Sequence, residues 1–565
     1  MRVICLLTVG FAAAVVQAAP PIFPLKDIRA GQHGVGRTVF SGSRVEEFQV
    51  EILGVLENIG PKESIILGRL KGGPLANTGV MQGMSGSPVY IDGKLAGAVA
   101  LGFPLSKEAI AGIRPIEEML RVDPEQKPRT NVSLARATAQ AGNQRLEEIA
   151  TPVSFSGFSA ATLEHFAPQL RALGLDPRQG VSGGGNPAPK LGDPARVEPG
   201  SMISVQLLSG DMSVGADGTV TYVDGTHIYA FGHRFLAGGP TEMPFARSEV
   251  LALLPNLSAS FKISAAREWM GTITEDRNTA ISGLIGRRAG TVPLEIHVDG
   301  RAYRMNMIQD RVMTPLVTQM AVFSSLDETE RSIGATTFTV RGHLDFDSGS
   351  VRLNDVYGGD VGASTVAALG VGAPLAYALS SGFDALKLKG VTLDIQELDR
   401  RAQSQIAEIT APRQVRPGDN LEVIVTLAGE NGQETSKVVR YKIPVGAPLG
   451  ALYLTVADAA SMNILDQQAA ASGSAHSPAR VLEYLNSLRA NTRAYLRVWR
   501  PEASYTLDGR DLSNPPPSLA LILARAQTGG AAGFNWRGSK IAEIEIPAGE
   551  RLVTGSKTIQ VEVKE

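Results

Sequence analysis

A serine lies at the centre of a run of small residues, Gly83-Met84-Ser85-Gly86-Ser87-Pro88, and a strand-like segment follows it. Glycine accepts backbone conformations with positive φ, so such a run can form a tight loop that presents one hydroxyl group. The backbone amides of Gly83 and Ser85 can then form an oxyanion hole for the negative charge of a tetrahedral intermediate. The pattern indicates a serine hydrolase, and a peptidase in particular.

A serine hydroxyl is a weak nucleophile, so Ser85 needs a general base. Among the seven histidines, His233 is the best candidate, because it follows a strand-like segment and a glycine. His227 is expected to be structural or exposed, and Ser87 is expected to be a turn hydroxyl. Two alternatives remain: Ser85 belongs to a structural turn or an inactive site, and His233 is a core or hairpin histidine.

The candidates for an orienting carboxylate are weaker. Asp276 is the first choice, Glu242 is a comparable alternative, and Asp224 is expected to serve its Asp-Gly turn. No His-x-x-x-His pair with a carboxylate suggests a metal site. His343, Asp345 and Asp347 alternate along one segment and could bind a cation, although a solvated strand face is favoured. We expect no metal and no cofactor.

Composition indicates a folded, turn-rich β protein. The chain has 565 residues, which suggests three or four domains, and 61 glycines and 33 prolines punctuate many short apolar runs. The formal net charge of −2 gives no sign of a nucleic-acid partner. Mostly β architecture is therefore expected, with a few helices.

The first residues have the pattern of a secretory signal. Arg2 precedes an apolar stretch, and small residues follow, so we expect residues 1–19 to be a signal peptide. An uncleaved anchor is the alternative. The only cysteine, Cys5, lies within this segment, and no later stretch is apolar and long enough to be expected to span a membrane. The protein is expected to be exported, to the periplasm or the exterior.

Changes in composition divide the rest of the chain. Asp-Gly pairs between apolar runs, such as Asp92-Gly93 and Asp224-Gly225, predict hairpins. The expected parts are a β unit with the serine motif (20–120), a linker with a short helix (121–195), a β unit with the histidine motif (196–325), an α+β region (326–400), a sandwich-like module (401–460) and a C-terminal α+β region (461–565).

The segment from Met81 to Val99 resembles the nucleophile segment of SpoIVB-type (stage IV sporulation protein B) serine endopeptidases. Thr219 to Asp224, followed by Ala230-Phe231-Gly232-His233, resembles the histidine region of that family, and Gly271 to Gly283 resembles a later strand region. The family is similar to chymotrypsin-like peptidases. The resemblance therefore implies two β-barrels with the site between them, and limited, regulatory cleavage of a protein partner.

Two departures from the family pattern matter. In the family the histidine precedes the serine, whereas here Ser85 precedes His233, so the two barrel halves are expected in permuted order. Permutation is acceptable chemically, because catalytic triads occur in several chain orders. The stretch from Leu67 to Gly72, where the family carries its aspartate, has no acid. A Ser-His dyad and an acid from elsewhere both remain open, and no PDZ-like segment is evident.

Three functions are compared. The first is an exported serine endopeptidase that acts on a protein or peptide through an acyl-enzyme, with Ser85 as nucleophile and His233 as base. The second is a non-catalytic envelope or surface binding protein that keeps the scaffold, with its C-terminal β modules binding an envelope partner. A polysaccharide-active or polysaccharide-binding protein is third, because only the β modules and the aromatic residues suggest it and no paired-carboxylate pattern supports it.

Overall fold

The computed structural model describes residues 21–121, 138–141, 144–180, 188–328, 335–359, 362–383, 385–470, 477–502, 504–507, 510–513, 515–526, 532–535 and 538–565. The expected signal peptide, residues 1–19, lies outside them. The chain forms two compact units, Met1–Thr291 and Val292–Glu565, and both candidate site residues belong to the first unit.

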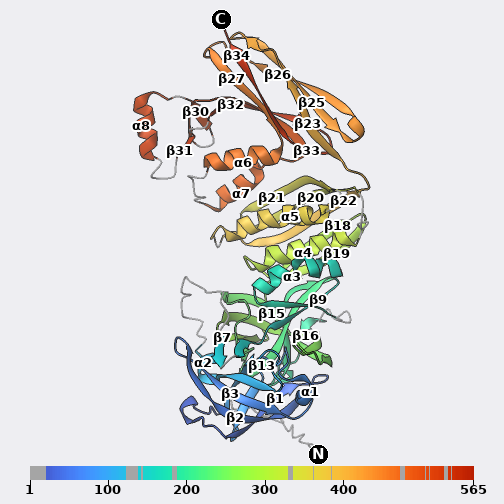
Figure 1. Ribbon diagram of the computed structural model, residues 1–565, viewed down its shortest axis with the longest axis vertical. Helices are drawn as coiled ribbons and strands as arrows, with labels where there is room; N and C mark the ends of the chain where they lie inside the picture. Colours follow the sequence, from blue (N-terminus) through green and yellow to red (C-terminus); the bar gives the residue numbers. More distant parts are fainter. Residues whose placement is uncertain are drawn as a thin grey trace, which may run out of the picture. The chain divides into compact units, whose positions relative to one another are not determined.

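The first β unit closes into a barrel. Its ring order is β1-β2-β3-β6-β5-β4, and β4 pairs antiparallel with both β5 and β1, which closes the ring. The strands, blue in Figure 1, are β1 (His33–Val39), β2 (Val45–Gly60), β3 (Glu63–Lys71), β4 (Pro88–Ile91), β5 (Lys94–Gly102) and β6 (Ile110–Pro115). Short elements beside them are η1 (Leu25–Asp27), α1 (Leu75–Thr78), α2 (Ile116–Met119), β7 (Thr138–Ala141) and β8 (Gln144–Glu148).

A second ring forms from the strands around His233. Its order is β12-β13-β14-β17-β16-β15, and the antiparallel pairings β12–β13 and β12–β15 close it. The strands are β12 (Met202–Gly210), β13 (Ser213–Asp224), β14 (His227–Ala230), β15 (Gly239–Leu254), β16 (Phe261–Arg277) and β17 (Ala280–Ile285). The expectation of a mostly β, chymotrypsin-like double barrel is confirmed.

The Asp-Gly pairs form the hairpin turns that the sequence predicts. Asp92 and Gly93 have φ values of 49° and 74° between β4 and β5, and Gly225 has a φ of 57° between β13 and β14. Positive φ at these positions matches the right-handed twist of the flanking strands in tight hairpins.

The segment between the barrels adds structure to the second one. Its elements are β9 (Thr151–Ser156), α3 (Ala160–Ala172), β10 (Leu175–Gln179), β11 (Ala188–Leu191) and η2 (Pro194–Arg196). β9 pairs antiparallel with β13 and parallel with β10, so this part of the chain extends the second barrel's sheet. Ser159 is the N-cap of α3, and its side chain accepts a hydrogen bond from the Thr162 amide.

The second unit begins with a sheet of order β19-β18-β22-β20-β21 and two helices. The helix α5 has the length and apolar composition of a membrane span, contrary to the expectation from the sequence, but 44% of it is buried and it packs on β20, β21 and α4. The elements are β18 (Val292–Val298), β19 (Arg301–Met307), α4 (Met313–Asp327), β20 (Thr336–Phe346), β21 (Gly349–Gly359), α5 (Ala363–Ser380) and β22 (Leu388–Leu398).

Two further sheets pack as a sandwich. Their orders are β26-β25-β23-β33 and β24-β34-β27-β28-β32, and they share one apolar core. The sandwich uses strands up to Val563, so it reaches beyond the alternating segment that suggested it. Its strands are β23 (Gln403–Thr410), β24 (Gln414–Val415), β25 (Asn420–Gly429), β26 (Glu434–Lys442), β27 (Gly450–Ala457), β28 (Arg493–Arg500), β32 (Ser539–Pro547), β33 (Leu552–Thr554) and β34 (Ser556–Val563).

Smaller elements complete the second unit. A three-stranded sheet has the order β30-β29-β31. These elements are η3 (Glu430–Gly432), α6 (Ala459–Ala470), α7 (Pro478–Ser487), β29 (Ser504–Leu507), β30 (Arg510–Ser513), α8 (Pro517–Ala526) and β31 (Ala532–Asn535).

Candidate active site

The serine loop, residues 83–88, is a tight and buried turn. Gly83 and Gly86 have φ values of 90° and 91°, a conformation that favours glycine on both sides of Ser85. The Ser87 amide donates to the Met84 carbonyl (2.9 Å), and the Gly86 amide donates to the Val99 carbonyl on β5 (2.7 Å). The turn is therefore hydrogen-bonded to β5 of its own barrel, and the Ser85 side chain is fully buried.

The second barrel holds the serine loop from the other side. The Thr219 amide donates to the Ser85 carbonyl (2.8 Å), and the Thr219 hydroxyl donates to the Gly83 carbonyl (2.9 Å). The Thr221 hydroxyl donates to the Gly86 carbonyl (2.7 Å). Two threonines on one face of β13 thus fix three carbonyls of the loop. No motif in the sequence assigns these threonines a role, although their i, i+2 spacing places them on one strand face.

The amides expected to form an oxyanion hole differ from their neighbours. The amides of Met84, Gly86 and Ser87 donate to backbone carbonyls, whereas those of Gly83 and Ser85 donate to no residue that the structure describes. The Ser85 Oγ also makes no hydrogen bond with any described residue. Two donors and one hydroxyl therefore remain available within a single turn.

His233 follows a strained turn at the end of β14. Phe231 has a φ of 70°, which is uncommon for a bulky residue, and Gly232 has a φ of 69°. A Cβ at Gly232 would lie 3.3 Å from the Val99 carbonyl oxygen, so this turn is pressed against β5. Backbone strain of this kind persists where the surrounding structure imposes it, and it gathers at functional sites.

The two turns touch each other directly. A Cβ at Gly86 would lie 2.5 Å from the Phe231 nitrogen, and Gly86 and Gly232 both approach Val99. The serine loop and the histidine turn are thus adjacent in space, although Ser85 and His233 are far apart in the sequence. The structure brings the two segments together at the junction of the two barrels.

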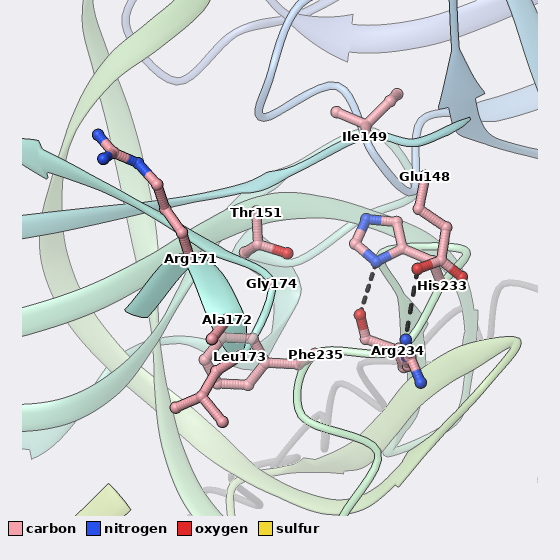
Figure 2. A pocket seen from close by; sticks show the side chains of 10 residues that line it. All are labelled: Glu148, Ile149, Thr151, Arg171, Ala172, Leu173, Gly174, His233, Arg234 and Phe235. Atoms are coloured by element: carbon pink, nitrogen blue, oxygen red, sulfur yellow. Dashed lines mark hydrogen bonds and ion pairs between the residues drawn. The ribbon is translucent and has the colours of Figure 1, made fainter. Parts of the chain in front are cut away.

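The imidazole of His233 has a defined partner on one side. Its Nδ1 lies 2.6 Å from the Arg234 carbonyl oxygen, an interaction drawn in Figure 2. A carbonyl oxygen can only accept, so Nδ1 carries a hydrogen, and in the neutral imidazole Nε2 then has the lone pair. This is the tautomer that a general base needs, and here a backbone carbonyl selects it.

Asp276 lies near His233 in a different way from that expected. Its carboxylate accepts hydrogen bonds from the amides of Phe235 (2.8 Å) and Leu236 (2.6 Å) and also from Ala237 and Gly238. The carboxylate therefore fixes the loop that follows His233. Through that loop, Asp276 positions the backbone that carries the His233 imidazole.

The burial of Asp276 gives a pH-dependent stability. Burial raises the pKa of Asp276 to about 6, and the four backbone amides oppose that shift. Because the folded-state pKa is raised, the contribution to stability is fully present below about pH 4 and is lost as the pH rises through about 6. We expect roughly 3 kcal/mol of this dependence, and the variant Asp276→Asn should lack it. Urea unfolding of both proteins from pH 4 to 8 measures the difference, and identical pH dependences would contradict the prediction.

The remaining candidates lie elsewhere. Glu242 is exposed and accepts a hydrogen bond from the Gly290 amide (3.2 Å). Asp224 and His227 are exposed and face each other across the β13–β14 turn. His343 pairs with Asp345 at 3.2 Å on a half-exposed strand face. Among the described residues, no group of three or more histidine, cysteine, aspartate or glutamate side chains is placed to hold a metal ion.

A cavity of about 210 Å³ adjoins His233 (Figure 2). Its walls include Glu148, Thr151 and the C-terminal end of α3, and the Arg234 side chain pairs with Glu148 at 3.8 Å. Ser85 does not line the cavity, and His233 is only 2% exposed. The Ser85 side chain is therefore not accessible to a substrate carbonyl in this conformation.

Comparison with protein families gives a match over part of the chain. Residues 10–120 match the SpoIVB peptidase S55 family, a stretch that includes the first barrel and the serine loop but not His233. Searches of the curated proteins and of the solved structures find no match. The first barrel is therefore similar to part of a serine peptidase domain, which supports a serine peptidase-like function.

Proposed function

We propose that this protein is a serine endopeptidase of the SpoIVB-like type, with its serine and histidine barrels in permuted order. The observation that supports it most is the contact between the serine loop and the histidine turn at the barrel junction. Ser85 Oγ is the nucleophile and His233 Nε2 is the base. The family match over residues 10–120 points to the same chemistry.

The proposed steps follow from this arrangement. Ser85 attacks the peptide carbonyl while His233 takes the hydroxyl proton, and the Arg234 carbonyl holds the imidazolium through Nδ1. The amides of Gly83 and Ser85 bind the oxyanion. His233 then protonates the leaving amine, and water hydrolyses the acyl-enzyme. A Ser-His dyad backed by a carbonyl is the form we propose, with Asp276 as a positioning residue.

We also place this activity outside the cytoplasm. The support is the signal-like pattern of residues 1–19 and the lack of cysteine after Cys5 in the sequence. A protein or peptide is the proposed substrate.

The non-catalytic alternative is favoured by one specific observation, the complete burial of Ser85. A fluorophosphonate probe separates the two functions, because it reacts only with an activated serine. We expect slow labelling of the full chain that is lost in Ser85→Ala and kept in Ser87→Ala, a matched change two residues away in the same buried loop. Labelling that Ser85→Ala retains, or no labelling of the wild-type protein, would favour the binding protein.

A further inference from the structure

A lysine side chain is buried beside the serine loop, and the proposed mechanism gives it no role. Lys262, in β16, is 1% exposed, and its Nζ donates to the Thr38 hydroxyl on β1 at 2.7 Å. Its backbone amide donates to the Gln82 carbonyl (3.2 Å), one residue before Gly83. Lys262 thus joins the second barrel to the first, next to the residue at which the serine loop begins.

The side chain of Lys262 packs on Gly83 itself. A Cβ at Gly83 would lie 3.2 Å from Lys262 Cδ and 3.4 Å from Lys262 Cβ. Nζ is two bonds beyond Cδ and donates to Thr38, so the ammonium group is buried near Gly83, whose amide is proposed for the oxyanion hole. An alanine at Gly83 would push against this side chain, which explains a need for glycine there besides its φ of 90°.

No carboxylate neutralises this charge at close range. Lys262 forms no ion pair within 4.0 Å with any residue that the structure describes. The charged group that acts on it is Asp217 on β13, which is also buried and accepts a hydrogen bond from Ser154 (3.1 Å). The other polar groups against Lys262, Thr38 and Gln82, are neutral.

We propose that Lys262 is a positioning residue of the peptidase site, whose buried ammonium group supports the Gly83 side of the oxyanion hole. The inference rests on the proposed function. A positive charge near the hole stabilises negative charge that develops on the substrate oxygen, and low polarity around it strengthens the effect. Burial also lowers the pKa of Lys262 to about 7, opposed by the charge of Asp217.

The charge of Lys262 therefore changes within the range in which the enzyme is assayed. The lysine is protonated below about pH 7 and loses its charge above it. A rate that depends on this charge should therefore decline on the alkaline side of about pH 7. A purely structural lysine would give no alkaline decline.

The test measures the second-order rate constant of fluorophosphonate labelling of the full chain from pH 5 to 9.5, corrected for probe hydrolysis. For the wild-type protein we expect a decline above about pH 7. For Lys262→Met we expect a rate reduced roughly ten- to a hundredfold at pH 6.5 and no alkaline decline. Lys262→Arg stays charged, so its labelling rate should not decline up to pH 9.5.

The outcomes separate this inference from the proposed function. Ser85-dependent labelling of the wild-type protein with a plateau up to pH 9.5 overturns the role of Lys262 alone, even if Lys262→Met fails to fold. A folded Lys262→Met with the wild-type profile does the same. A wild-type protein that is never labelled at Ser85 overturns both. Far-UV circular dichroism and thermal unfolding establish whether each variant is folded.

Discussion

Gly86→Ala is expected to destabilise the protein by about 4 kcal/mol and to abolish labelling of Ser85. Gly86 has a φ of 91°, and an added Cβ would overlap the Thr219 carbonyl oxygen and lie 2.5 Å from the Phe231 nitrogen. Both neighbours are backbone atoms, so neither can move without separating the barrels. Urea unfolding measures the change in the free energy of unfolding.

Gly93→Ala is the matched control for this effect. Gly93 also has a positive φ, 74°, in the hairpin that follows the serine loop, but an added Cβ would meet no atom within 4 Å. It should cost only the backbone strain, about 1 kcal/mol, and leave labelling intact. Equal losses of stability in the two variants would show that the contact between the serine loop and the histidine turn contributes nothing to the free energy of unfolding.

His233→Gln is expected to slow phosphonylation of Ser85 by roughly a thousandfold, because the hydroxyl then has no general base. Glutamine keeps much of the volume of the buried imidazole, so the fold should change little. His227→Gln, an exposed position on β14 six residues earlier, is the matched control and should react at the wild-type rate. Stopped-time labelling with gel or mass detection gives both rates.

If His233→Gln folds and reacts with the probe as fast as the wild-type protein, His233 is not the general base. The serine would then depend on another group, or it would react without activation. Thermal unfolding of the same samples distinguishes such a result from a loss of labelling caused by unfolding.

The local elements could be predicted from the sequence because their signals are local. Asp92-Gly93 defines a hairpin by its φ requirements, and the helix α3 follows the periodicity of Phe166 and Leu170, both buried. The serine loop could be predicted for the same reason, since its glycines do have positive φ. The closure of each ring could not, because it depends on pairings such as β1–β4 between distant strands.

The β16 residues that lie beside the serine loop could not be predicted. They reverse the usual alternation along a strand, in which apolar side chains are buried and polar side chains are exposed. In β16, Lys262 and Ser264 point inward while Phe261 and Ile263 are half-buried, so a polar face looks into the junction of the barrels. Alternation in the sequence would place the lysine in solvent. The role of Asp276 was also missed in its detail, because its partners are backbone amides that carry no sequence signal.

A crystal structure of the phosphonylated protein is the decisive experiment for the proposed site at Ser85 and His233. We predict phosphorus bonded to Ser85 Oγ, a phosphonyl oxygen within hydrogen-bonding distance of the Gly83 and Ser85 amides, and His233 Nε2 close to the leaving-group side. An adduct on another residue would rule out this site, as would one on Ser85 with its oxygen turned away from these amides and His233 out of reach.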